Sequence, residues 1–247
     1  MKITFLGTNG WFDNNNGSTI CTLVETSKEY IILDAGFGLY KAKKYITKNK
    51  PIYLFISHTH LDHICGLHGL SGLRPKQGLT IICSKISRLN IAKIISKPFT
   101  FPLKNYKFLT NYKIVKPGKY TSPFNFEVTG LKHNIPTLGI KIKADNKIVT
   151  YCCDTAPCPN DIKLAQNADI LIHECSLLPG DTSFKWGHTS PDQAGKLAKL
   201  TNAKKLFLTH FDAVQYASKD KFGLALKTAR KHFPNTFLAK DDVKIKI

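Results

Sequence analysis

The sequence predicts an α/β (α+β) fold in which two packed β-sheets are covered by helices, giving four layers in the order αββα. Three observations lead to this class. The first half of the 247 residues reads mainly as short apolar strands, the last third alternates helix with strand, and no repeat or low-complexity linker divides the chain. We therefore expect a single domain that spans residues 1–247.

The first half is expected to consist mainly of strands, bounded by turn residues. They cover residues 1–6, 18–25, 30–33 and 52–56. The last of these, Ile52-Tyr53-Leu54-Phe55-Ile56, is an unbroken apolar run of the kind found in strands buried on both faces. Residues 38–48 have the spacing of a helix. A second helix is expected at 85–96, where Lys97-Pro98 ends it.

The second half is expected to add three more strands and then helix–strand units. The three strands cover residues 124–131, 139–143 and 148–152. Asn160 is expected to cap a short helix that runs to Asn167 and precedes a strand at 169–172. Ser190-Pro191-Asp192-Gln193 has the form of a capping box with proline at the first helical position, and a strand at 205–209 follows that helix.

The composition, with 43% hydrophobic and 21% charged residues, is that of a globular protein. No apolar run is long enough to span a bilayer, and the N-terminus reads as a strand rather than a signal peptide, so we expect a cytoplasmic location and no membrane partner. The seven scattered cysteines are expected to be reduced and mostly buried. A thiolate ligand from Cys152, Cys153 or Cys158, beside Asp154, is the alternative.

The formal net charge of +19 points to a surface that attracts anions, such as nucleic acid. Only three of the basic residues are arginines, so the charge comes mostly from lysine. Lysine gives less bidentate phosphate recognition than arginine. The lysine excess is therefore open to a second interpretation, a compositional bias of the source.

Several predicted strands stop at a residue that can bind a metal or carry a proton. These residues are Asp34, His58, Asp154, Glu174 and His210. Ligands collect where the strands of layered α/β proteins end. The densest group is His58-Thr59-His60-Leu61-Asp62-His63, which follows a buried strand directly. Imidazole and carboxylate are preferred ligands of zinc and similar ions, and this spacing can serve two metals.

The run HTHLDH resembles the HxHxDH signature of the metallo-β-lactamase superfamily, and the other strand ends follow that family's order along the chain. The resemblance implies two divalent metal ions, with zinc the first expectation and manganese or iron the alternatives. It implies that His58, His60 and His133 bind one metal, that Asp62, His63 and His210 bind the other, and that Asp154 bridges them. Asp34 would orient the histidine loop.

A narrower resemblance is to the ribonuclease Z branch of that superfamily. His173-Glu174-Cys175-Ser176, Gly187-His188-Thr189-Ser190 and Leu208-Thr209-His210-Phe211 resemble its HEAT, HST and LTHF segments. The resemblance implies that His188 protonates the leaving oxygen and that Glu174 orients it. His188 could instead simply pack at the start of the following helix.

Two features depart from that branch. Its long tRNA-binding arm lies between the third histidine and the bridging aspartate, where this chain has only 20 residues, between His133 and Asp154. Its PxKxRN loop is replaced here by Phe12-Asp13-Asn14-Asn15-Asn16-Gly17. The resemblance therefore implies the chemistry more firmly than a tRNA substrate.

The expected activity is phosphodiester hydrolysis by a metal-bridging hydroxide, as in a ribonuclease Z-like endoribonuclease. Asp62 would also accept the proton of the attacking water, and His188 would protonate the leaving group. The alternatives are a hydrolase of small or cyclic phosphodiesters, thioester or lactam hydrolysis on the same metal frame, and a metal-stabilised RNA-binding module without turnover. By analogy with related enzymes, a homodimer is expected.

Overall fold

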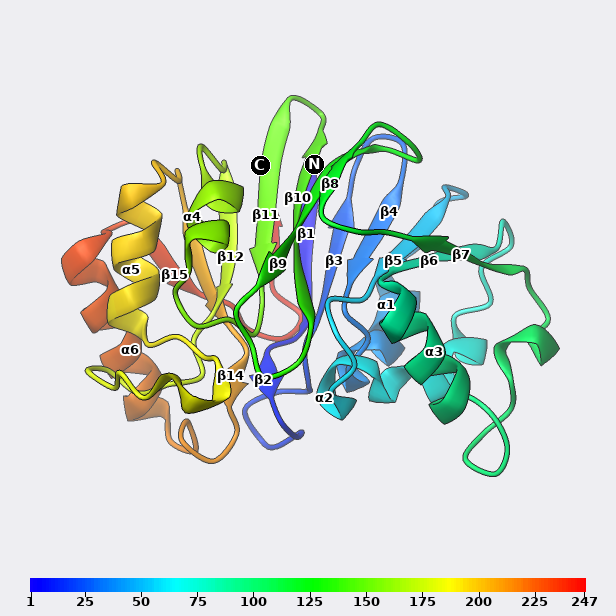
Figure 1. Ribbon diagram of the computed structural model, residues 1–247, viewed down its shortest axis with the longest axis horizontal. Coiled ribbons are helices and arrows are strands. Elements are labelled where there is room, and N and C mark those ends of the chain that lie inside the picture. The colour runs from blue at the N-terminus through cyan, green and yellow to red at the C-terminus, as the bar shows by residue number, and fades with distance from the viewer.

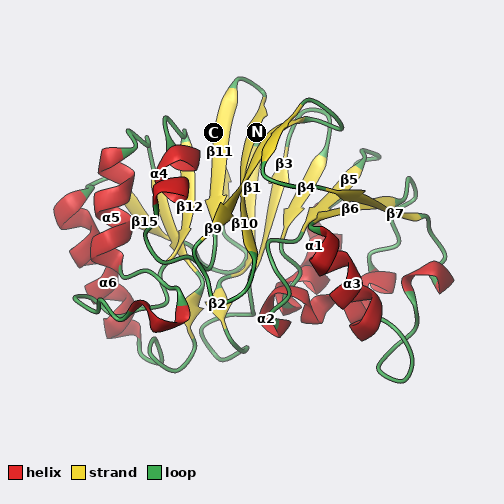
Figure 2. Cartoon of the chain, viewed as in Figure 1, coloured by secondary structure: helices red, strands yellow, loops and turns green.

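Two seven-stranded β-sheets face one another at the centre of the molecule, and helices lie on both outer sides (Figures 1 and 2). The computed structural model describes residues 1–247, apart from the side chain of Phe184. The predicted αββα layering is confirmed. That the whole chain forms one domain stays a prediction. Among the helices of the described residues, none is both long and apolar enough to cross a membrane.

The first sheet contains mostly strands from the first half of the chain. Its order is β16 (Lys244–Lys246), β1 (Lys2–Gly7), β3 (Cys21–Glu25), β4 (Tyr30–Leu33), β5 (Ile52–Phe55), β6 (Leu79–Cys83) and β7 (Thr110–Ile114). From β4 to β7 the strands run parallel. The C-terminal strand β16 pairs antiparallel with β1, so the two ends of the chain lie side by side.

The second sheet contains strands from the second half. Its order is β15 (Thr236–Leu238), β13 (Leu206–Thr209), β12 (Ile170–Glu174), β11 (Lys147–Cys152), β10 (Thr137–Ala144), β9 (Asn125–Leu131) and β8 (Gly118–Tyr120). The strands from β11 to β15 are parallel, and β8 to β11 form an antiparallel meander. A short parallel pair, β2 (Asn9–Gly10) with β14 (Phe211–Asp212), joins two loops at the ends of the sheets.

Burial follows the alternation of side chains along each strand. In β4, Ile31 and Leu33 enter the core between the two sheets, whereas Tyr30 and Ile32 enter the core under the helices of the first sheet. In β5, Phe55 faces the inter-sheet core, and Ile52 and Leu54 face the helices. These strands are buried on both faces, as their continuous apolar runs predicted.

Helices cover the outer face of each sheet. The first face carries α1 (Ala42–Tyr45), α2 (Leu61–Ile64), α3 (Lys85–Ile94) and the 3₁₀ helices η1 (Phe37–Lys41), η2 (Cys65–Gly72) and η3 (Leu103–Asn105). The second carries α4 (Pro159–Ala165), α5 (Pro191–Leu200) and α6 (Lys219–His232), with η4 (Phe184–Trp186) in the loop before α5. The expected capping box of α5 is present, because the Ser190 N–H donates to the Gln193 side chain at 2.9 Å.

Two local predictions differ from the structure. The helix expected at 38–48 is present but ends earlier, because the 3₁₀ helix η1 is followed by only one turn of α-helix, which ends at Tyr45. The tight turn fits because Gly38 packs on strand β1, where a Cβ would lie 2.7 Å from the Gly7 nitrogen. Asn160 does not cap α4. The N-cap is Cys158, because Pro159 takes the first helical position and the Asp161 carboxylate accepts from the Cys158 N–H at 3.3 Å.

Candidate metal centre

The strand ends that carry the predicted ligands meet at one rim of the two sheets, near the labels α2 and β2 in Figure 1. From the first sheet, Asp34 follows β4 and the segment His58–His63 follows β5. From the second sheet, Asp154 follows β11 and His210 follows β13. The structure brings all seven predicted ligands together at this rim, where they form two groups of side chains that share Asp154.

The first group contains His58, His60, His133 and Asp154. The Nδ1 atom of His60 lies 3.0 Å from Nε2 of His58 and 3.2 Å from Nε2 of His133. The Oδ2 atom of Asp154 lies 3.6 Å from Nε2 of His58 and 3.5 Å from Nε2 of His133. Three imidazole nitrogens and one carboxylate oxygen therefore converge on one point.

The second group lies on the other side of the Asp154 carboxylate. Its Oδ1 atom is 3.2 Å from Nε2 of His63 and 3.1 Å from Nε2 of His210. The Oδ2 atom of Asp62 lies 3.1 Å from Nε2 of His210 and 3.6 Å from Nε2 of His63. Asp154 thus presents one oxygen to each group, which is the geometry of a bridging ligand.

Cys153 also approaches the second group, and its thiol lies 3.3 Å from Oδ1 of Asp154. The side chain is fully buried, and burial raises the pKa of Cys153 well above its ordinary value. The thiol is therefore protonated and donates to the carboxylate, which argues against a thiolate ligand. All seven cysteines are free, as the sequence predicted.

Hydrogen bonds on the far side of four of the five ligand histidines fix which nitrogen faces the cluster. The Nδ1 atom of His63 lies 2.9 Å from the Asp34 carboxylate, and that of His133 lies 3.1 Å from the Gly187 carbonyl oxygen. Both partners can only accept, so both Nδ1 atoms carry the proton. The Nε2 atoms that face the cluster are then free to bind a cation.

Two serines set the other rings in the same way. Ser57 donates its only hydroxyl proton to Asp34 at 2.8 Å, so it accepts from Nδ1 of His58 at 3.0 Å. Ser176 donates its proton to the His210 carbonyl oxygen at 2.8 Å, so it accepts from Nδ1 of His210 at 2.9 Å. The rings of His58 and His210 therefore also turn Nε2 toward the cluster.

The arrangement fits two small divalent cations. The Nε2 atoms of His63 and His210 face one another across 3.0 Å, so positive charge must lie between them, as a proton or as a metal ion. A tetrahedral zinc ion with Zn–N bonds of about 2.0–2.1 Å separates its ligands by roughly 3.3 Å. The ligand atoms of each group lie close to that spacing. Imidazole and carboxylate donors of this kind suit zinc, manganese and iron alike.

The pKa shifts agree with a site built for cations. Burial raises the pKa of Asp154 and Asp62, but the neighbouring histidines outweigh it and hold both carboxyl groups well below their ordinary range. Burial lowers the pKa of His63, but Asp154, Asp62 and Asp34 raise it well above its usual value. Positive charge is therefore strongly favoured at this position.

Glu174 and His188 form a separate pair beside the cluster. Nδ1 of His188 lies 3.0 Å from Oε1 of the fully buried Glu174, whose carboxylate also accepts from the N–H groups of Thr155, Ser176 and Thr189. The His188 ring centroid is 5.1 Å from that of His133. Burial alone would lower the pKa of His188, but the neighbouring carboxylates, chiefly that of Glu174, outweigh burial and raise the pKa to about 9. Glu174 therefore favours the protonated form of the ring.

Three of the strand ends hold a non-glycine residue in the left-handed backbone region. The φ angles are 57° at Asp34, 50° at Asp154 and 54° at His210. This conformation is uncommon for residues other than glycine and clusters at functional sites. In each case it turns the chain sharply out of the strand, so that the side chain faces the rim.

The groups that orient the ligands were not predicted from the sequence; they are the side chains of Ser57, Ser176 and Tyr151 and the carbonyl of Gly187. Tyr151 donates to Asp34 at 2.7 Å from the opposite sheet. Ser57 and Ser176 each stand one or two residues from a predicted functional residue, so position alone could have suggested them. The contacts of Gly187 and Tyr151 join distant segments and leave no local signal.

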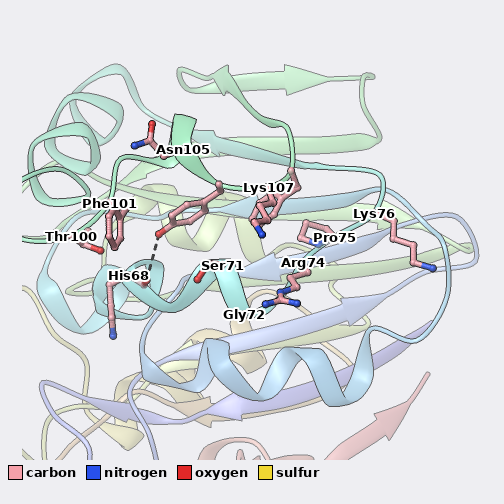
Figure 3. A pocket seen from close by; sticks show the side chains of 12 residues that line it. His68, Ser71, Gly72, Arg74, Pro75, Lys76, Thr100, Phe101, Asn105 and Lys107 are labelled. Carbon is pink, nitrogen blue, oxygen red and sulfur yellow. Dashed lines mark hydrogen bonds between the residues drawn. The ribbon is translucent and has the colours of Figure 1, made fainter.

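A cavity of about 520 Å³ lies away from the cluster. It opens between the η2 segment and the loop 100–108 (Figure 3). Arg74 and Lys107 line it together with the aromatic rings of Phe101, Tyr106 and Phe108. Its lining also includes His68, whose ring contacts that of Phe37 edge-on with centroids 5.9 Å apart.

Comparison with known proteins gives one family match. A family model described as "Beta-lactamase superfamily domain" matches residues 29–211, well over half of the chain. Among curated relatives, Ribonuclease Z of Prochlorococcus marinus (strain MIT 9312) is 26% identical, and the alignment covers 98% of each chain. Ribonuclease Z of Lactobacillus helveticus is 27% identical over 100% of this chain and 98% of the relative. These alignments span 306 and 322 positions, so they contain segments that this 247-residue chain lacks.

Solved structures share the fold over the whole chain. The metallo-β-lactamase fold protein YhfI from Bacillus subtilis superposes with a TM-score of 0.83 at 24% identity, covering 99% of this chain and 98% of that one. The short form of human tRNase Z superposes with a TM-score of 0.78 at 23% identity, covering 100% of this chain and 99% of that one. A diphosphatase from the PhnP family superposes with a TM-score of 0.73 at 16% identity, covering 100% of this chain and 97% of that one.

Proposed function

Because this chain belongs to the β-lactamase superfamily, we propose that it is a metal-dependent phosphodiesterase that cleaves RNA as an endoribonuclease. Two curated relatives that it matches over 98% of their length are named Ribonuclease Z. The observation that carries the proposal is the buried Glu174–His188 pair beside the two ligand groups. A hydrolase that expels a poorly stable alkoxide needs such a proton donor.

The proposed metal ligands are those that converge in two groups. His58, His60 and His133 would hold one ion, Asp62, His63 and His210 the other, and Asp154 would bridge them. Zinc is our first candidate, and the donor set also accepts manganese or iron. When bound, two such ions supply Lewis acidity that activates water and neutralises charge on the phosphoryl oxygens.

The protein's own groups would manage the protons. Asp62 is ionised, and its Oδ2 atom already accepts a hydrogen bond from the backbone N–H of Trp11 at 2.8 Å, which fixes its position. It is therefore placed to receive the proton of the attacking water. Glu174 holds His188 through Nδ1 and favours its protonated form, so Nε2 is the nitrogen that would donate a proton to the leaving oxygen.

A 3′-extended tRNA precursor tests the proposed substrate. We expect metal-loaded protein to cut it at a single position and Asp62→Ala to leave it intact, with the product ends mapped by sequencing. If a folded protein that holds two metals leaves every RNA intact, the proposal is wrong.

A second candidate is hydrolysis of small or cyclic phosphodiesters, and one observation favours it. The 20 residues between His133 and Asp154 are occupied by the β10–β11 hairpin, closed by the two-residue turn Asp145-Asn146 with φ values of 51° and 56°. This segment follows the sheet and contains no projecting arm. Cleavage of a small diester without cleavage of RNA would select this candidate.

Two other expectations rest on composition and analogy alone. We retain a cytoplasmic location and a homodimeric state as predictions. A non-catalytic RNA-binding module remains the alternative from another functional class. RNA binding by a fully metallated protein that hydrolyses no phosphodiester would identify it.

A further inference from the structure

The chain has only two tryptophans, Trp11 and Trp186, and both stand next to the metal centre with most of their surface in solvent. The two residues are 66% and 60% exposed. Tryptophan is on average a well-buried residue. The large rings of Tyr30, Tyr151 and Tyr216 follow that rule and are fully buried. The two tryptophans therefore need an explanation other than core packing.

Trp11 is tied to the second ligand group. Its backbone N–H donates to the Oδ2 atom of Asp62 at 2.8 Å, and its own φ is 71°, a strained value for a bulky residue. Hydrogen bonds within the loop that carries Trp11 fix its conformation. The Asn9 side chain donates to the Gly17 carbonyl at 2.9 Å and to the Asn14 side chain at 2.8 Å. The ring of Phe12 lies beside it, with centroids 5.6 Å apart.

Trp186 is tied to the first ligand group. It precedes Gly187, whose carbonyl fixes the His133 ring, and it stands two residues before His188. The Nζ atom of Lys185 lies over the Trp186 ring, 5.6 Å from its centroid. An exposed indole and a cation are therefore placed beside the proposed proton donor.

We propose that Trp11 and Trp186 stack on unpaired nucleobases that flank the scissile phosphate, so that the site selects single-stranded RNA. Each tryptophan belongs to a segment that contacts a different ligand group, so a strand whose phosphate lies at the cluster can reach both. Every base has a π-face, so stacking tolerates any sequence. Bases inside a duplex are already stacked and offer no free face. This inference rests on the proposed endoribonuclease function.

The test compares two RNA strands of equal charge. One is a decamer of uridines and the other is an abasic decamer with the same number of phosphates, each carrying a fluorescent label for anisotropy. Binding is measured to metal-loaded protein in a His188→Ala background, which slows turnover. Quenching of the intrinsic fluorescence gives a second readout, because both tryptophans of the chain lie at the site.

We expect each of Trp11→Ala and Trp186→Ala to raise the Kd for the uridine decamer about tenfold, while the Kd for the abasic decamer stays within about twofold. The variants Trp11→Phe and Trp186→Phe should keep most of the affinity for the uridine decamer that the alanine variants lose, because an aromatic ring remains. Phe99, which is 75% exposed in the loop after α3, supplies the matched control, and Phe99→Ala should bind both decamers like the parent protein.

Equal weakening for both decamers would mean that the substitutions disturb the loops rather than stacking, and would overturn the inference. Equal affinity of the parent protein for the two decamers would also overturn the inference. The proposed function fails separately, if wild-type protein cleaves no RNA. Binding needs no turnover, so the two failures remain distinct.

Discussion

Nδ1 of His63 donates a hydrogen bond to Oδ2 of Asp34 across 2.9 Å, and both side chains are fully shielded from solvent. The same carboxylate accepts from the Ser57 hydroxyl, the Ser57 N–H and the Tyr151 hydroxyl. Asp34 therefore controls His63 directly and His58 through Ser57. One buried carboxylate links both ligand groups to the cores of the two sheets.

Asp34→Asn should lower the metal affinity of the site by about 10- to 100-fold. The amide can no longer accept every hydrogen bond of the carboxylate, so the His63 ring loses its fixed tautomer. Metal affinity is measured by competition with a chromogenic chelator. Asp220→Asn, on the exposed first turn of α6, is the control and should bind metal normally. An unchanged affinity in Asp34→Asn would show that the far-side hydrogen bonds do not matter.

His188→Ala should slow cleavage of RNA by about 10²- to 10⁴-fold, the usual contribution of a general acid. The loss should be much smaller for a p-nitrophenyl phosphodiester, because p-nitrophenolate leaves without being protonated. Initial rates on both substrates measure the difference. His232→Ala, at the end of α6, should leave both rates unchanged. Equal losses on the two substrates would contradict the proton-donor role.

Gly187→Ala should weaken metal binding and destabilise the protein by about 1–3 kcal/mol. The φ of Gly187 is 76°, and a Cβ there would lie 2.6 Å from the Cα atom of His133. Gly180 is a matched control, because its φ is 79° but nothing lies within 4 Å of a Cβ. Gly180→Ala should show the backbone strain without the loss of metal. Equal metal affinity in the two variants would exclude the contact with His133.

The Lys41–Asp241 pair, which ties the C-terminal segment to η1, should stabilise the protein up to high pH. Burial lowers the pKa of Lys41, but Asp241 and Asp242 raise it above its ordinary value of 10.5. Because the lysine pKa is raised in the folded protein, the ion pair contributes its full stabilisation below the pKa of the unfolded chain. That stabilisation is lost as the pH rises through the pKa of the folded protein. Thermal melts of wild type and Asp241→Asn should therefore converge above about pH 10.5. A constant difference across that range would refute the assignment.

RNA binding should weaken steeply with salt, because the net charge of +19 favours contacts with many phosphates. For six or more phosphate contacts, affinity falls by about 10³-fold or more between 50 and 200 mM salt. The KM for a small cyclic diester should change little over the same range. Anisotropy titrations at several salt concentrations measure the slope. A flat response for RNA would favour the small-diester alternative.

The parts of the site with a local signal could be predicted from the sequence. Apolar strands that end abruptly at Asp34, His58, Asp154 and His210 can be recognised in one dimension, because a buried strand followed by a charged or imidazole side chain is costly without a partner. His133 is different, since it follows β9 without a dense cluster around it. Only the resemblance to a family assigned it.

The remaining errors come from contacts that the local sequence does not encode. The strands β7 and β8 lie at sheet edges and are only partly buried, so their hydrophobic alternation is weak. Strands β6, β15 and β16 and helix α6 were also not predicted, because they are completed by pairing or packing with distant segments. In α4, the choice of Cys158 over Asn160 as N-cap depends on Pro159 and Asp161 together.

The most direct test of the dinuclear hydrolase is to strip the protein with a chelator, reload it stepwise with zinc, and follow metal content and phosphodiester hydrolysis together. We predict two ions per chain, with hydrolysis rising as the second ion binds, and fewer than two ions in Asp154→Ala. A folded protein that holds two ions per chain and hydrolyses neither RNA nor a small phosphodiester would contradict the proposed function.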